Sequence, residues 1–402
     1  MDPLSRDEVR VISSIDEGDI VDLTRKLIDI PSVNPPGNEK PVAELIARYL
    51  SKFKIDADVR EVLPGRPNVV ASIEGESNER RLIFDGHMDV VPAGEGWDGR
   101  AFQASIVDGK IIGRGASDMK GGLAAMITAI TAIKKAGLRL RGELLLQAVV
   151  DEEVACRGVK SIIKEGLKAD YAIVGEPTQL SICTAHKGRL GVKIVAYGKA
   201  AHASTPGNGV NAISAMVDLI GQITSYGKRL ESMCHPILGK PTQAVTMIKG
   251  GINHNIIPSE CTMVVDRRLI PGETIESVED DYRQMAGQAQ VKGVSFKVDF
   301  PEDITSLAGP LETPIDELVV KTLQSVTREV TGKSNITGFP ATTEAYFLDK
   351  AGVSTVIFGP GSINQAHKPN EYVEVKELVQ AAKIYALTAI RLLKDREAKT
   401  SS

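Results

Sequence analysis

Two residues that could bind or orient a metal ion, His87 and Asp89, follow an apolar run in the sequence LIFDGHMDVVP, residues 82–92. In an extended backbone, side chains two positions apart point the same way. The imidazole of His87 could therefore ligate a metal ion while Asp89 orients it or shares the site. Two polar residues after a strand often form only a loop, so this hypothesis depends on the residues that recur downstream.

Acidic residues recur at three further places. Asp118 stands in GRGASDMKGG, residues 113–122, just before an apolar helical stripe, where it could also be a simple helix N-cap. The sequence DEE, residues 151–153, follows a nearly continuous apolar run. Adjacent carboxylates repel each other unless a cation is present, although a solvated loop is the alternative. Glu176 follows a third apolar run, and a second histidine, His367, lies in GPGSINQAHKPNEY near the end of the chain.

Strands and helices that alternate along the chain must position these residues. The expected strands are 68–73, 82–84, 143–150, 171–174 and 354–358, and the expected helices are 18–30, 38–54, a segment through 123–133, 315–331 and 375–394. This alternation predicts an α/β fold, an αβα domain with a parallel sheet. Ligands bind such sheets at the carboxyl ends of the strands, so the residues should converge there around two divalent ions with a shared carboxylate.

The middle of the chain changes character. Residues 181–201 are rich in strand-forming residues, and a helix, two strands, a second helix and a last strand follow up to residue 300. The order β-α-β-β-α-β predicts a ferredoxin-like sandwich inserted into the first domain. We therefore expect a catalytic domain formed by residues 1–182 and 299–402, interrupted by a second domain of residues 183–298.

Composition excludes several classes of protein. With 402 residues the chain is long enough for two domains, and a net charge of -4 gives no reason to expect nucleic acid or an anionic membrane as a partner. No apolar run approaches the roughly 18 residues of a membrane span, and the polar N-terminus resembles no export signal, so a cytoplasmic protein is expected. The four cysteines are far apart and are expected to be free, buried thiols.

Six motifs, in this order, resemble one known family: LIFDGHMDVVP, GRGASDMKGG, DEE, VGEPT, HASTP and GPGSINQAHKPNEY. The family is that of the dizinc hydrolases acetylornithine deacetylase, succinyl-diaminopimelate desuccinylase and carboxypeptidase G. The resemblance covers nearly the whole chain. It implies a zinc-peptidase-like catalytic domain with an inserted dimerisation or lid domain, and hence a homodimer.

The resemblance also implies a role for each residue of the cluster. It places His87, Asp118 and Glu176 around one zinc ion, and Asp118, Glu153 and His367 around a second, with Asp118 bridging. Cobalt or manganese could substitute for zinc.

Three further expectations concern the surroundings of the metal ions. Asp89 would orient His87, and Glu152 would be the general base. Neighbouring side chains of an extended segment point apart, so spacing alone cannot decide between Glu152 and Glu153. Family members often have a cis peptide after the bridging aspartate, which makes Asp118–Met119 a candidate.

The inserted domain would contribute to the substrate site. By resemblance, His202 would stabilise an oxyanion in the partner subunit, while Asn255 and Arg268 would grip a substrate carboxylate. Arg267 is expected to be a solvated charge. Glu344 could face a cationic substrate side chain or simply cap a helix.

The resemblance implies hydrolysis of the amide bond of an N-acyl amino acid. Where many relatives carry Asp-Ala-Arg or Asp-Gly-Arg, this chain has Glu344-Ala345-Tyr346, which weakens a doubly anionic acyl group and favours acetylornithine deacetylase. Such enzymes serve arginine or lysine biosynthesis, although the sequence does not identify the pathway. The alternatives are a carboxypeptidase, dipeptidase or broad aminoacylase and, remotely, a non-catalytic metal-binding scaffold.

Overall fold

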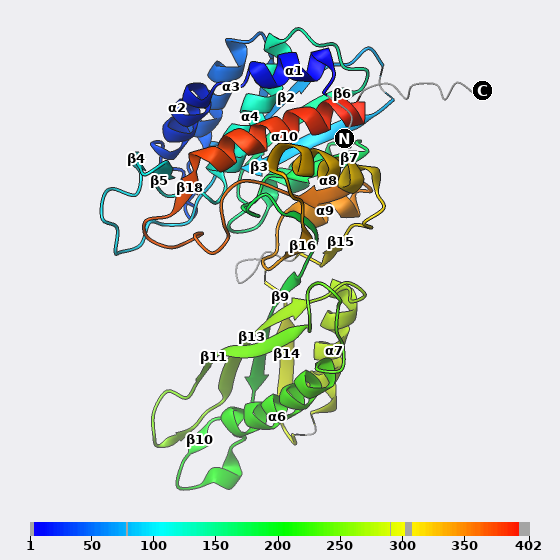
Figure 1. Cartoon of the computed structure of the whole chain (residues 1–402). Helices are drawn as coiled ribbons and strands as arrows, with labels where there is room; N and C mark the ends of the chain where they lie inside the picture. The colour runs from blue at the N-terminus through cyan, green and yellow to red at the C-terminus, as the bar shows by residue number, and fades with distance from the viewer. Residues whose placement is uncertain (1–3, 78, 290, 302–307, 394–402) are drawn as a thin grey trace, which may run out of the picture. The chain divides into compact units, whose positions relative to one another are not determined.

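The computed structural model describes residues 4–77, 79–289, 291–301 and 308–393, which form two compact units (Figure 1). The larger unit comprises the chain up to Thr184, Thr313–Phe339 and the chain from Glu344 onward; the inserted unit comprises Ala185–Glu312 and Pro340–Thr343. The inserted unit thus ends later than the sequence predicts, at 312 rather than 298. The reason is pairing: Ala308 bridges to Arg189, and β15 (Leu311–Glu312) pairs with the end of β8.

The sheet of the larger unit is mixed, in the order β1-β2-β6-β3-β7-β17-β8. Its strands are β1 (Ala57–Leu63), β2 (Arg66–Ile73), β3 (Arg81–His87), β6 (Glu143–Val149), β7 (Tyr171–Val174), β8 (Ile182–His186) and β17 (Ser354–Ile357), and β16 (Ile336–Phe339) pairs with β8. The expectation of a wholly parallel sheet is wrong, because only β6, β3, β7 and β17 run parallel. A short turn joins β1 to β2, and a hairpin of that kind forces antiparallel pairing.

One strand breaks the sequence order of the sheet. β17 lies between β7 and β8, which are consecutive in the chain. The sheet is therefore continuous only when a segment from beyond the inserted unit enters it.

Helices cover the sheet because their apolar residues recur with helical spacing. The helices of the larger unit are α1 (Arg6–Ser13), α2 (Glu17–Ile28), α3 (Lys40–Ser51), α4 (Lys120–Lys135), α5 (Arg157–Lys164), α8 (Leu318–Thr331), α9 (Ala345–Lys350) and α10 (Val375–Leu393). Residues 120–133 of α4 are all buried, since α4 packs against β3, α2 and α10. Figure 1 shows α10, in red, crossing over α4. On the opposite face, α5 and α9 contact each other, and α9 packs on β7 and β17.

A small three-stranded sheet borders this core, with β18 (Tyr372–Glu374), β5 (Lys110–Ile112) and β4 (Ser105–Val107) in that order. Of the four cysteines, three are buried as expected, but Cys234 is exposed. None of the helices in the described part of the chain combines the length and apolar character needed to cross a membrane.

The inserted unit has the predicted order β-α-β-β-α-β. Its elements are β9 (Gly188–Tyr197), α6 (Ala212–Leu230), β11 (Thr242–Gly250), β13 (Glu260–Leu269), α7 (Ile275–Gln288) and β14 (Ser295–Asp299). The antiparallel sheet has the order β11-β13-β9-β14, and the two helices share one core with it. A two-residue strand pair is formed by β10 (Ala201–His202), which lies between β9 and α6 in the chain, and β12 (Ile256–Ile257), which lies between β11 and β13. The 3-10 helix η1 (Pro206–Asn208) contacts β10. The ferredoxin-like topology is confirmed.

Candidate metal centre

The cluster of acidic and imidazole residues lies where neighbouring parallel strands end. His87 is the last residue of β3, Glu152 and Glu153 follow β6, and Glu176 follows β7. These three strands are adjacent and parallel, so their carboxyl ends share one edge of the sheet. Asp118 comes from the segment just before α4. Its peptide bond to Met119 is cis, as expected.

Asp118 lies between the two histidines. Its Oδ1 is 3.2 Å from Nε2 of His87, and its Oδ2 is 3.4 Å from Nε2 of His367. Two ligands of one tetrahedral ion at ordinary zinc–ligand distances lie about 3.3 Å apart. Each oxygen of this carboxylate is therefore placed to share a cation with a different imidazole.

Further carboxylates complete both sides. Oε2 of Glu153 is 3.2 Å from Nε2 of His367, while Oε1 of Glu176 and Oε2 of Glu152 are 3.8 and 4.0 Å from Nε2 of His87. Among the described residues, the groups compact enough to hold one ion are His87 with Glu152 and Glu176, and His87 with Asp118 and Glu153. The other oxygen of Glu153, Oε1, is buried and has no hydrogen-bond partner in the described part of the chain.

The electrostatics of the cluster favour added positive charge. Burial raises the pKa of Glu152 to about 8, and burial together with the Asp118 charge raises that of Glu176 well above its usual range. Hydrogen bonds to Asp118 and Glu153 raise the pKa of His367 to about 10. Two divalent cations would balance the four carboxylates and replace these protons, so the donor set fits a dinuclear centre.

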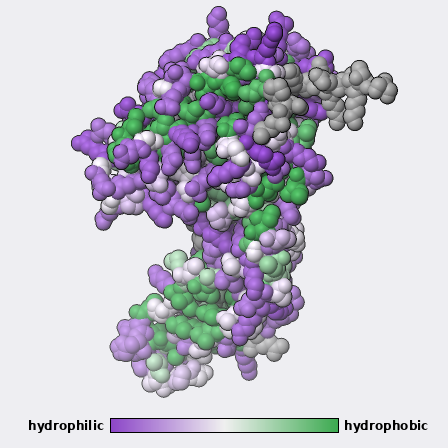
Figure 2. Space-filling model, in the orientation of Figure 1, coloured by the Kyte–Doolittle hydropathy of each residue, from purple (hydrophilic) through white to green (hydrophobic). Residues whose placement is uncertain are grey.

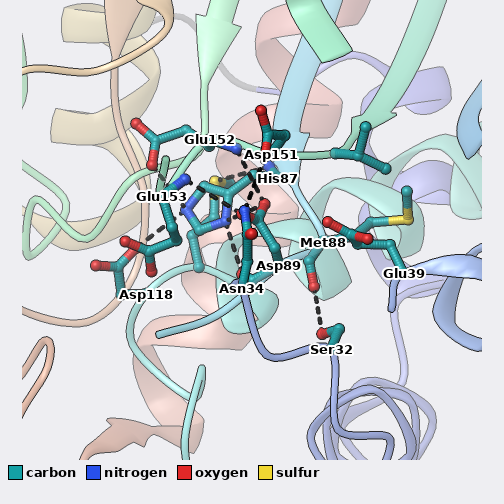
Figure 3. Close-up of polar contacts among 12 residues, drawn as sticks. Ser32, Asn34, Glu39, His87, Met88, Asp89, Asp118, Asp151, Glu152 and Glu153 are labelled. Carbon is teal, nitrogen blue, oxygen red and sulfur yellow. Dashed lines mark hydrogen bonds and ion pairs between the residues drawn. The ribbon is translucent and has the colours of Figure 1, made fainter. Parts of the chain in front are cut away.

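Asp89 acts differently from what the sequence predicts (Figure 3). Its backbone oxygen, 2.9 Å from Nδ1 of His87, is closer to the imidazole than its carboxylate Oδ1, which is 3.6 Å away. The carboxylate instead accepts the backbone N–H groups of Glu152 and Glu153, at 3.1 and 3.2 Å. Asp89 therefore orients His87 mainly through its main chain and holds the acidic loop with its side chain.

Sequence reasoning missed one more residue beside the cluster. The buried carboxylate of Glu371 accepts the backbone N–H groups of Ser117 and Asp118, both at 2.9 Å, and binds Arg114 at 2.6 Å. It thus fixes the segment that carries the central carboxylate. Its position four residues after His367, within the same motif, is the sequence feature that could have identified it.

Comparison with known proteins identifies the family. Residues 83–391 match the model of peptidase family M20/M25/M40, a span that contains every residue of the cluster. The chain belongs to peptidase family M20/M25/M40. It is therefore a metal-dependent hydrolase, as the sequence predicts.

Relatives of the M20 chain have varied names. It is 27% identical to a probable succinyl-diaminopimelate desuccinylase of Staphylococcus aureus, over 96% of this chain and 100% of the relative. It is 30% identical to N-formyl-4-amino-5-aminomethyl-2-methylpyrimidine deformylase of Halalkalibacterium halodurans, over 91% and 92%. The fold matches a dinuclear metal binding peptidase of the M20 family from Bacillus subtilis with a TM-score of 0.70 and 17% identity, over 94% and 98% of the two chains.

Three residues predicted to act on the substrate, His202, Asn255 and Arg268, belong to the inserted unit. His202, in β10, and Asn255, just before β12, are exposed, and the N–H of Ala203 donates to the backbone oxygen of Asn255 at 2.9 Å. Nδ1 of His202 accepts the backbone N–H of Ser204 at 3.1 Å, so the neutral ring carries its proton on Nε2. Arg268 is partly exposed and binds Asp266 through two hydrogen bonds, at 2.7 and 3.2 Å.

The expectation that Arg267 is solvated is wrong, and of the two alternatives for Glu344, capping a helix with its side chain is not observed. Arg267 is fully buried rather than solvated, because alternate residues of β13 face the core, where Arg267 pairs with Glu273. Glu344 stands at the N-cap position of α9, but its side chain makes no capping hydrogen bond. It is fully buried, and its carboxyl group faces that of Asp85, which also raises its pKa along with burial.

Proposed function

We propose that this M20 hydrolase cleaves the amide bond of an N-acyl amino acid, in the manner of acetylornithine deacetylase or succinyl-diaminopimelate desuccinylase. The observation that carries the proposal is the position of Asp118, whose two oxygens each face a different imidazole at 3.2 and 3.4 Å. A carboxylate shared between two imidazoles can bridge two cations, and a pair of cations can drive hydrolysis of an amide.

We propose that His87, Asp118 and Glu176 hold one zinc ion and that Asp118, Glu153 and His367 hold the other, with cobalt or manganese as substitutes. When bound, the two ions would polarise the acyl carbonyl and lower the pKa of water. The distances in the cluster support this division, because Glu176 faces His87 and Glu153 faces His367.

Glu152 is proposed as the general base. Its carboxylate oxygen Oε2 lies 4.0 Å from Nε2 of His87, beside the proposed cations, where it can reach a water bound to them. It would take a proton from the attacking water and pass it to the leaving amine.

The inserted unit is proposed to bring a donor and a carboxylate-binding group to the substrate. His202 has its Nε2–H free to stabilise an oxyanion, since Nδ1 accepts from Ser204. Arg268 and Asn255 would hold the α-carboxylate, with the guanidinium exchanging Asp266 for the substrate.

A homodimer formed through the inserted unit is part of this proposal. β11 is an edge strand, and Val245, Met247 and Ile248 on it are exposed, as are Ile213 and Val217 of α6. Figure 2 shows hydrophobic side chains gathered on the visible face of this unit. Exposed apolar edge strands commonly pair with a second chain, which here would bring His202 to the partner's centre.

The acyl group is the least constrained part of the proposal. One relative is named a desuccinylase and another a deformylase, which supports an acyl group on nitrogen as the shared substrate feature. Where many relatives carry a second arginine, in Asp-Ala-Arg or Asp-Gly-Arg, this chain has Tyr346, and the missing positive charge disfavours a doubly anionic substrate. The second candidate is a dipeptidase or carboxypeptidase, favoured by the M20 peptidase of matching fold.

The test is a substrate panel. Chelated protein, reconstituted with zinc, cobalt or manganese, is assayed on N-acetylornithine, N-succinyl-diaminopimelate, N-formyl amines and a set of dipeptides. The proposal expects kcat/KM to be highest for an N-acyl amino acid. Preference for dipeptides would support the second candidate, and no turnover with any metal would contradict both.

A further inference from the structure

The segment PSVNPPGN, residues 31–38, contains no helix or named strand, yet it contacts residues beside the metal centre. Ser32 Oγ donates to the backbone oxygen of Met88 at 2.6 Å. The Asn34 N–H donates to the oxygen of Val90 at 2.9 Å, and the Val90 N–H donates to Ser32 at 3.0 Å. The loop is therefore fixed along the segment that directly follows His87.

Asn34 connects two carboxylates at this point (Figure 3). Its side-chain amide, Nδ2, donates to Oδ2 of Asp89 at 2.7 Å and to Oδ1 of Asp151 at 3.0 Å. All three residues are buried, with Asn34 only 2% exposed. Because the amide is neutral and has two hydrogens, it can join two anions that would otherwise repel each other.

Arg66 provides the positive charge behind this connection. Its guanidinium lies 3.0 Å from Oδ1 of Asp151 and forms a two-pronged pair with Glu39, at 2.8 and 2.5 Å. A Cβ atom at Gly37, where φ is +91°, would lie 2.2 Å from this guanidinium. A side chain at position 37 would therefore clash with Arg66, so this position requires glycine.

Asp151 is the first acid of the DEE sequence and is not part of the ligand cluster. Its φ is +71°, and its backbone oxygen accepts the N–H groups of Ala155 and Cys156. Asp151 therefore sets the turn from which Glu152 and Glu153 project. Asp89, held by the same Asn34, accepts the N–H groups of both glutamates.

We propose that Asn34, Asp151 and Arg66 are positioning residues that hold the Glu152–Glu153 peptide in register with the metal ligands. The expected effect on kcat depends on the proposed role of Glu152 as the general base. The expected effect on the mobility of the loop does not depend on that role. The network acts through Asp89 and touches neither substrate nor cation.

The test compares Asn34→Leu with the wild-type protein. Leucine has a similar size but donates no hydrogen bond, so both carboxylates lose their bridge. Altered residues behind metal ligands typically cost about 10- to 100-fold in activity, and we expect such a fall in kcat with KM changed less than about threefold. Metal content by elemental analysis stays at the wild-type value, and amide hydrogen exchange of the peptide 150–156 becomes faster.

Arg157→Gln is the matched control. Arg157 also donates to Asp151, through Oδ2 at 2.9 Å, but its side chain is 41% exposed, whereas Asn34 and Arg66 are buried. We expect this variant to keep wild-type kcat within about twofold, as for other exposed ion pairs. Asn34→Ser, which keeps one donor, gives an intermediate fall in kcat and serves if the leucine variant does not fold.

The outcomes separate this inference from the proposed function. Kinetics use whichever substrate the wild-type protein cleaves, and hydrogen exchange needs no substrate. Wild-type kcat in Asn34→Leu, unchanged exchange at residues 150–156, or loss of metal would each overturn the inference. If the wild-type protein cleaves only dipeptides, the N-acyl proposal fails while the exchange result still decides this one.

Discussion

The polar residues proposed to act in the two units differ in how exposed they are and in how their segments are supported. In the larger unit, the side chains of His87, Asp118, Glu153 and Glu176 are at most 9% exposed, and neighbouring groups fix the segments that carry them. His367 is the exception among the five proposed ligands, with its side chain 52% exposed. In the inserted unit, His202 and Asn255 are exposed on a two-residue strand pair, and Arg268 is bound to Asp266. A buried cluster is organised before any ligand arrives, whereas an exposed set needs another surface to define what it binds.

The variant expected to distinguish the two regions most clearly is Glu152→Gln. Replacing Glu152 with glutamine removes the base but keeps the shape of the side chain, so turnover should fall about 10²- to 10⁴-fold. Metal content should remain at the wild-type value, in contrast to Glu153→Gln, which should lose metal. Steady-state kinetics with elemental analysis of both variants measures this. Wild-type turnover in Glu152→Gln would remove the residue from the mechanism.

The exposed set is tested at His202. His202→Ala removes one oxyanion donor, and we expect kcat to fall about 10²- to 10³-fold with metal content unchanged. If the ring serves the partner's centre, co-expression with Glu152→Gln chains should restore activity to about one quarter of wild type, because mixed dimers hold one intact site. Absence of restoration in isolated mixed dimers would place His202 in its own chain's site.

The thermal stability of the metal-free protein and its affinity for zinc should change with pH in opposite directions. The raised pKa values of His367, to about 10, and Glu152, to about 8, mean that protons stabilise the metal-free fold. That stabilisation is complete below the unfolded values and is lost as pH rises through the folded values. The Tm of chelated protein should therefore fall as the pH rises from about 4.5, through the Glu152 range up to 8 and the His367 range of 6.5 to 10.

Zinc binding should show the opposite trend, because the imidazoles must release protons to bind a cation. Affinity should rise about tenfold for each proton released per pH unit. Calorimetric titrations in buffers of different ionisation enthalpy count these protons. A zinc affinity independent of pH would contradict the predicted ligand set.

The smallest effect is expected at the edge strand of the inserted unit. Met247 is 66% exposed on β11, and Met247→Lys places a charge on the proposed dimer surface. Sedimentation should show weaker self-association by about tenfold or more, with the Tm of the monomer changed by little, since surface substitutions usually cost less than about 0.5 kcal/mol. Met233→Lys, an exposed methionine on the same unit outside β11, is the matched control.

Sequence alone predicts the part of the fold that depends on periodicity. The ends of the parallel strands converge as expected, because His87, Glu152 and Glu176 each follow an apolar run. The inserted β-α-β-β-α-β order is confirmed for the same reason.

What sequence could not predict depends on contacts between distant segments. β2 pairs antiparallel with β6, a strand far along the chain, and it carries no ligand, so nothing in the motifs reveals its direction. The burial of Arg267 depends on which face of β13 meets the core and on its partner Glu273. Asn34 lies 117 residues from Asp151, and no local pattern in PSVNPPGN announces that contact.

The place of β17 between β7 and β8 has a consequence for biosynthesis. While the polypeptide is still emerging from the ribosome, β7 and β8 are available long before the strand that separates them, and His367 appears later still. The inserted unit can form its own core in the meantime. The proposed dinuclear metal site, in contrast, lacks a ligand until translation is nearly complete. A nascent chain stalled before residue 354 should therefore bind zinc poorly, even though four of the five proposed ligands have already been made.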